Sequence, residues 1–140
     1  MTSPDPLIAS IRIAAPPDVV FPYLIDPALL ARWFGDATGS TPEPGGAFAI
    51  AFDHTKSVQG RFVTIDPPKR VVFTWGVPDS DVLPPGSTTV EIVLTPDGSD
   101  TVVDLTHHDL PRSEVSSHQA GWTGLLNKLE RVAADGISVH

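Results

Sequence analysis

The residues best suited to chemistry gather near the C-terminal end of the chain, in the stretch LTHHDLPRSEVSSHQAGWTGLL from Leu105 to Leu126. This stretch holds three histidines, His107, His108 and His118, and the tryptophan Trp122. An imidazole can ligate a metal, move a proton near neutral pH or hydrogen bond to a buried polar group. The stretch therefore allows three kinds of site, namely a metal site, a catalytic site or the wall of a ligand cavity.

A metal site is the least favoured of the three. His107 and His108 are neighbours on a strand-like segment, so their side chains point to opposite faces of a sheet. His107 and His118 can meet, but a zinc ion would need further ligands. The nearby acidic residues have no recognisable ligand spacing, and the chain has no cysteine. We predict no bound metal and no cofactor.

Catalysis by His107 or His118 stays open as an alternative, because either can act as an acid or a base on a bound molecule. A hydrolase would also need a nucleophile, and no G-x-S-x-G turn is present to expose a serine. Two other interpretations carry more weight. The two histidines satisfy buried polar groups where strand gives way to helix, or they contact a ligand. The sequence favours a binding protein over an enzyme, and no catalytic residue is predicted.

The spacing of apolar residues predicts how the chain positions these side chains. Apolar and polar residues alternate in Ile8–Ala14 and in several segments between Gly45 and His108, which is typical of antiparallel strands with one buried face. Two short helices are expected between residues 18 and 34, the first of them kinked or partly 3₁₀ at Pro22. A long amphipathic helix is expected from about Ser113 to Asp135.

These elements predict one domain of the α+β class over residues 1–140, with its core at about 8–135. A curved antiparallel sheet of about six or seven strands would wrap around the long C-terminal helix. Gly60–Ile65 has apolar residues on both faces, so we expect a bulge near Gly60. Gly121 and Gly124 each cost the long helix about 1 kcal/mol relative to alanine. Close approach of the sheet, or room for a ligand, would compensate. Residues 76–86 are expected to be a long hairpin connection, with a lid over the cavity as the alternative.

The charge of the chain excludes several classes of partner. The formal net charge is −8, and the nine lysines and arginines are scattered. Nucleic acid and anionic membrane surfaces should repel such a chain. Its first residues do not resemble a secretory signal, and no apolar run approaches the roughly 18 residues of a membrane span. We therefore expect a cytoplasmic protein, either a monomer or a homodimer, without a nucleic-acid or membrane partner.

Five motifs carry a resemblance to a known family. They are APPDVVFPYLIDPALLARWFG at 15–35, PGGAF at 44–48, DPPKRVVFTW at 66–75, LTHHDLP at 105–111 and HQAGW at 118–122. In this order they resemble the activator of heat shock protein 90 ATPase homologue (AHSA1-like) family. That family is part of the START-like superfamily, also called SRPBCC, whose fold is the helix-grip. The chain departs from the pattern at His108-Asp109, where relatives have a small residue and glycine, and at Pro22.

The resemblance implies a mostly apolar cavity between the long helix and the sheet, which superfamily members use for lipids, sterols and polyketides. We therefore expect a small hydrophobic molecule as the partner. Two alternatives also follow from the resemblance: a chaperone as partner, with the chain as an ATPase-activating module, or a cyclase-, aromatase- or hydrolase-like enzyme that uses pocket histidines. For each aromatic residue, plain core packing is the competing interpretation. The predicted ligand-binding residues are Tyr23, Trp33, Phe34, Phe48, Phe52, Phe73, Trp75, His107, His118 and Trp122.

Overall fold

The strands of the protein form one antiparallel sheet. The computed structural model describes residues 6–138, and the side chains of residues 6–135. The sheet is six-stranded, with the order β1-β6-β5-β4-β3-β2. Consecutive strands from β2 to β6 are neighbours, and β1 pairs with β6, so that β1 and β2 are the edge strands. The strands are β1 (Leu7–Ile13), β2 (Ala47–Ala51), β3 (Ser57–Asp66), β4 (Arg70–Trp75), β5 (Thr88–Asp97) and β6 (Asp100–His108).

Each of the short helices after β1 has a proline at its first or second position. The first helical segment divides into α1 (Pro17–Val20) and a 3₁₀ turn, η1 (Phe21–Leu24), so the 3₁₀ geometry expected at Pro22 is confirmed. Asp26 then caps α2 (Pro27–Leu30), with its Oδ1 accepting a hydrogen bond from the amide of Ala28 at 2.9 Å. The α-helix ends at Leu30 and turns replace it up to Phe34, so α2 is shorter than expected.

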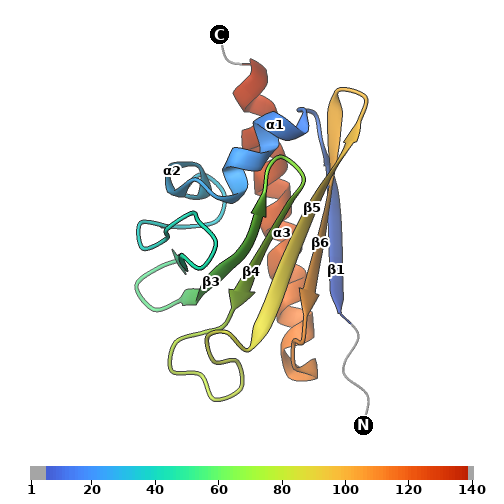
Figure 1. The fold of residues 1–140 in the computed structure, drawn as a ribbon. Helices are drawn as coiled ribbons and strands as arrows, with labels where there is room; N and C mark the ends of the chain where they lie inside the picture. The colour runs from blue at the N-terminus through green and yellow to red at the C-terminus, as the bar shows by residue number, and fades with distance from the viewer. Residues whose placement is uncertain (1–5, 139–140) are drawn as a thin grey trace.

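The long helix α3 (Arg112–Ser138) lies along one face of the sheet, with α1 beside it (Figure 1). Its buried side chains recur at spacings of three and four: Trp122, Leu126, Leu129 and Ala133. This stripe packs on the inward face of the sheet and confirms the helix-grip architecture. None of the helices within residues 6–138 is both long enough and apolar enough to cross a membrane.

Strand β3 contains an irregularity that explains why its sequence has apolar residues on both faces. Its register with β4 shifts between Phe62 and Thr64, so the side chain of Val63 turns outward and is 51% exposed. The shift therefore lies at Val63 and not at Gly60, where the sequence predicted a bulge. Gly60 is needed for another reason, because a Cβ atom there would overlap the carbonyl oxygen of Thr74 on β4.

The end of β6 brings the histidine-rich stretch to the long helix. Asp109 follows His108 with a φ of 68°, a left-handed conformation that glycine adopts most easily. This is the position where the family pattern has glycine, so the chain keeps the turn with a different residue. Aspartate is among the side chains that tolerate this conformation best. Three residues later α3 begins at Arg112.

Candidate ligand-binding site

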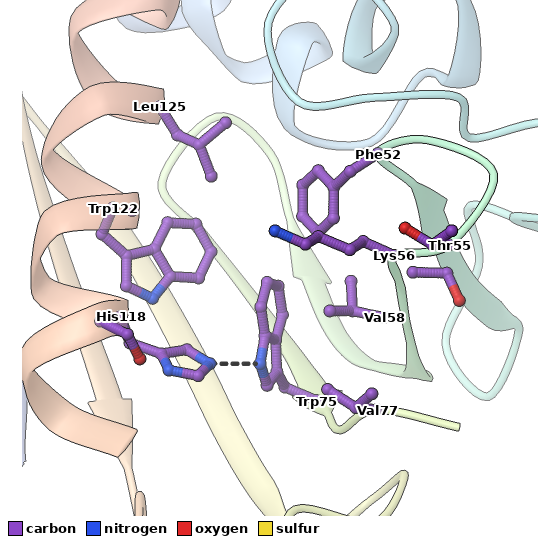
Figure 2. A pocket seen from close by; sticks show the side chains of 12 residues that line it. Phe52, Thr55, Lys56, Val58, Trp75, Val77, His118, Trp122 and Leu125 are labelled. Carbon is purple, nitrogen blue, oxygen red and sulfur yellow. Dashed lines mark hydrogen bonds between the residues drawn. The ribbon is translucent and has the colours of Figure 1, made fainter. Parts of the chain in front are cut away.

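A pocket of about 400 Å³ lies between α3 and the β2–β3 turn (residues 52–56). Its walls come from the β2–β3 turn and the start of β3, from β4 and the residues after it, and from α3 (Figure 2). Small ligands bind in concave, mostly apolar sites with a few polar groups. The apolar wall is formed by Phe52, Val58, Trp75, Val77, Trp122 and Leu125, and the polar lining by Thr55, Lys56, Ser57, Ser117 and His118.

Aromatic rings fill much of the space between the sheet and α3. The rings of Phe48 and Phe73 stack with their centroids 4.0 Å apart. Trp122 contacts Phe34 edge-on at 5.6 Å and lies 5.0 Å from Trp75. Aromatic pairs at these separations add about 0.5 to 1.5 kcal/mol beyond the area that they bury. The pocket is bounded on its inner side by this cluster.

His107 is the centre of a buried hydrogen-bond chain. It is 0% exposed, and its Nδ1 accepts a hydrogen bond from Nε1 of Trp122 at 3.0 Å. Thr88 donates its hydroxyl hydrogen to the carbonyl of Trp75 at 3.0 Å, so at its 2.8 Å contact with His107 the Nε2–H group is the donor. Both ring nitrogens of the neutral imidazole therefore have protein partners.

The environment of His107 opposes its protonation. Burial is the main cause that lowers the pKa of His107 from its ordinary value of 6.5 to about 3, and the charges of His118 and His108 add to the effect. His107 is therefore neutral at physiological pH. A general acid at neutral pH needs a proton that it can give to a substrate, and this histidine has its only N–H bonded to Thr88.

His118 occupies the pocket wall and pairs with the second tryptophan. Its Nδ1–H donates to the carbonyl of Glu114 at 2.8 Å, and its Nε2 accepts from Nε1 of Trp75 at 3.3 Å (Figure 2). The rings of His107 and His118 lie with their centroids 5.5 Å apart, so the two side chains meet as the sequence predicted. Each of the two imidazole rings accepts a hydrogen bond from the indole N–H of a tryptophan. His108 lies on the other face of the sheet, with its Nε2 at 3.9 Å from Glu91. Within residues 6–138, no group of three His, Cys, Asp or Glu residues is placed to hold a metal.

The ten residues predicted to bind a ligand fall into three groups. Four of them line the pocket: Phe52, Trp75, His118 and Trp122. Another four lie in the buried core behind it: Phe34, Phe48, Phe73 and His107. Tyr23 and Trp33 are also buried but lie away from the pocket lining. Nε1 of Trp33 donates to the carbonyl of Tyr23 at 2.8 Å, and the Tyr23 hydroxyl joins η1 to α3 by donating to the carbonyl of Val132 at 3.4 Å. Ligand contact by any of the ten stays a prediction.

Apart from Phe52, the β2–β3 turn is the part of the site that the sequence patterns did not identify. Asp53 holds this turn, because its Oδ1 accepts hydrogen bonds from the amide of Thr55 at 2.7 Å, the hydroxyl of Thr55 at 2.9 Å and the amide of Lys56 at 2.8 Å. These bonds, the Thr55 amide first, lower the pKa of Asp53. Aspartate with a threonine two residues later is a known turn signal, and it could have located the turn.

We expect Asp53→Ala to loosen the pocket rim. The variant loses three hydrogen bonds within the turn, so it should be less stable than the unaltered protein. Urea denaturation measures the difference. Asp53→Asn is the matched control, because its amide oxygen can still accept from the turn. Equal stability of Asp53→Ala and the unaltered protein would show that the carboxylate does not hold the turn.

The loop between β4 and β5 contributes one residue to the pocket. The amide of Val77 donates to the carbonyl of Leu83 at 2.6 Å, and the amide of Leu83 donates to the Ser80 hydroxyl at 2.9 Å. Leu83 is 1% exposed and anchors the loop in the core. The loop is a hairpin connection between antiparallel neighbours, as expected, and it places Val77 in the pocket wall.

Comparisons with known proteins identify similar chains. The family described as Activator of Hsp90 ATPase homolog 1-like protein matches residues 14–134. An AHSA1-like protein from Rhizobium etli is 36% identical, with a TM-score of 0.70, over 96% of this chain and 86% of that chain. The solution structure of CalU16 from Micromonospora echinospora is 28% identical, with a TM-score of 0.71, over 88% of this chain and 62% of that chain. No curated protein matches this chain.

A further structural likeness concerns the fold alone. DynU16, a protein of the dynemicin biosynthetic locus, has a TM-score of 0.81 at 24% identity. The match covers 95% of this chain and 48% of that one, so this chain spans about half the length of DynU16. The six-stranded sheet and the long C-terminal helix are thus shared with proteins of distant sequence.

Proposed function

Since this chain belongs to the activator of Hsp90 ATPase homolog 1-like family, we propose that it binds a small hydrophobic or amphipathic molecule in the pocket between α3 and the β2–β3 turn. The observation that carries the proposal is the pocket of about 400 Å³, within the range of about 300 to 1,000 Å³ that is usual for ligand sites. Its apolar wall would stabilise a ligand by about 25 cal/mol for each Å² of apolar surface buried. The place of DynU16 in a biosynthetic locus supports a small-molecule partner.

Gly121 supports the proposal because its lack of a side chain keeps the pocket open. It lies in the third turn of α3, and a Cβ atom built there has no neighbour within 4 Å. A glycine inside a helix costs about 1 kcal/mol relative to alanine. Packing against the sheet does not require this glycine, and its place in the pocket wall leaves space for a bound molecule.

Native mass spectrometry of the freshly purified protein tests the proposal directly. We expect a mass above that of the chain, and we expect the excess to be released on denaturation as one small molecule or a narrow set of them. The same sample should then bind N-phenyl-1-naphthylamine, a neutral fluorescent probe. A clean mass together with no binding of this probe would overturn the proposal.

Gly121→Leu should close the pocket without harm to the fold. The new side chain meets no neighbour within 4 Å of its Cβ, and it removes the helix penalty of glycine, so the free energy of unfolding should stay equal or rise by up to about 1 kcal/mol. We expect the dissociation constant of N-phenyl-1-naphthylamine, measured by fluorescence titration, to rise at least tenfold.

Gly124→Leu is the matched control for this experiment. Gly124 lies one turn further along the same helix, also has no neighbour within 4 Å of a built Cβ, and lines a groove on the outer side of α3 instead of the pocket. It should bind the probe as the unaltered protein does. Equal probe binding by Gly121→Leu and Gly124→Leu would mean that the probe occupies some other surface.

A further inference from the structure

The polar part of the pocket lining includes a lysine and no carboxylate. Its ionisable members are Lys56 and His118, beside three hydroxyl side chains, and no aspartate or glutamate lines it. This differs from the chain as a whole, in which 17 acidic residues outnumber nine lysines and arginines. The pocket lining thus holds one lysine and no carboxylate, on a protein that is acidic as a whole.

The backbone of Lys56 is held at the rim of this pocket. Its amide donates to Asp53 at 2.8 Å and its carbonyl accepts from the amide of Phe52 at 2.8 Å, so the backbone of the residue is tied to the turn. Figure 2 shows the side chain extended beside Phe52, with Nζ reaching across the pocket toward Trp122. Within the described part of the chain, Lys56 makes no ion pair shorter than 4.0 Å.

Three other polar side chains of the lining already use their hydrogen-bonding groups within the protein. The hydroxyl of Thr55 donates to Asp53 at 2.9 Å, and that of Ser117 donates to the carbonyl of Glu114 at 3.2 Å. Both ring nitrogens of His118 are occupied as well, Nδ1 by the carbonyl of Glu114 and Nε2 by Nε1 of Trp75. Lys56 therefore supplies the charged donor of the pocket, next to the hydroxyl of Ser57.

We propose that the ligand is an amphipathic carboxylate whose apolar body fills the pocket and whose ionised head pairs with the ammonium group of Lys56. This inference rests on the proposed function and adds the charge of the ligand to it. A carboxylate loses more hydration than an alcohol when it leaves water, so an apolar pocket without a cation would prefer the alcohol. A lysine at the rim reverses that preference, because a hydrogen bond to a charged group contributes more than one between neutral groups.

Displacement of N-phenyl-1-naphthylamine by a matched pair of ten-carbon molecules tests the proposal. At pH 7.5 decanoate is ionised and decan-1-ol is neutral. We expect decanoate to displace the probe from the unaltered protein at about one tenth of the concentration that decan-1-ol needs, which corresponds to about 1.4 kcal/mol. The preference should shrink as salt is added, because the pair lies at a solvent-accessible rim.

Lys56→Gln assigns the effect to one residue. We expect the variant to need about tenfold more decanoate, with the values for the neutral probe and for decan-1-ol unchanged within about twofold. Lys69→Gln, which changes the charge equally in the β3–β4 turn, is the control and should behave as the unaltered protein does.

The other outcomes of these experiments would overturn either the carboxylate inference alone or the proposed function as well. Equal displacement by decanoate and decan-1-ol, an equal effect of Lys56→Gln on both, or an equal effect of Lys69→Gln on decanoate would overturn the carboxylate inference and leave the proposed function standing. A clean native mass together with failure of the neutral probe to bind the unaltered protein would overturn the proposed function and this inference with it.

Discussion

The Trp122→Ala variant is expected to lose about 3 to 5 kcal/mol of the free energy of unfolding, the range found for truncation of large buried aromatic residues. Trp122 is 2% exposed and packs against Phe34 and Trp75. Its removal leaves a cavity between α3 and the sheet and deprives Nδ1 of His107 of its donor. Urea denaturation followed by far-ultraviolet circular dichroism measures the loss.

Trp122→Phe separates packing from hydrogen bonding. It keeps an aromatic ring but removes the indole N–H, so a buried acceptor on His107 is left without a partner, which costs about 1 to 3 kcal/mol. We expect Trp122→Phe to be less stable than the unaltered protein and more stable than Trp122→Ala. If Trp122→Phe matches the unaltered protein, the bond to His107 contributes nothing to stability. Leu125→Ala, at a partly buried position of the same helix, is a control with a smaller expected loss.

The two tryptophans in the pocket wall are each oriented by a hydrogen bond to a histidine. Each presents its ring to the pocket and donates its N–H to a histidine, Trp75 to His118 and Trp122 to His107. Both rings are thereby fixed before any ligand arrives. A preformed apolar wall reduces the ordering cost of binding. In this interpretation the histidines of the C-terminal stretch orient the pocket wall.

The parts of the fold with a strong local period could be predicted from the sequence. Alternation of apolar and polar residues between Gly45 and His108 predicted antiparallel strands there, and the amphipathic pattern from about Ser113 to Asp135 predicted the long helix that α3 confirms. The inward facing of His107 followed from its parity with Leu105, and both are 0% exposed. Pro22 predicted a 3₁₀ turn because its ring and its missing N–H act on the residues directly before it.

The parts that depend on contacts between distant segments could not be predicted. The register shift at Val63 and the close approach of Gly60 to Thr74 on β4 both depend on contacts between strands, which no local pattern records. Lys56 reaches the pocket because the turn at Asp53 folds toward α3, more than 60 residues away in the chain. The pairing of each histidine with a tryptophan is also a tertiary result. Two facing aromatic residues can be anticipated, but their hydrogen-bond partners cannot.

Acid should destabilise the protein through His107 well before its carboxylates are protonated. In the unfolded chain a histidine takes up a proton below about pH 6.5, whereas folded His107 stays neutral down to about pH 3. The unfolded state therefore binds more protons in this window, and stability falls as pH falls. Between pH 7 and pH 5 the loss from His107 is about 2 kcal/mol. That figure changes little with the folded pKa as long as the pKa stays below about 4.

Comparison with His107→Gln isolates this contribution. Glutamine is neutral at every pH and can still donate and accept, so the variant starts less stable but should lose about 2 kcal/mol less between pH 7 and pH 5 in urea denaturation. Should the variant fail to fold, the ring resonances of His107 in the unaltered protein answer the same question, and they should not shift between pH 8 and pH 4.5. Titration of that ring near pH 6 would contradict the prediction, because a histidine with both nitrogens bonded inside the core has no room for a second proton.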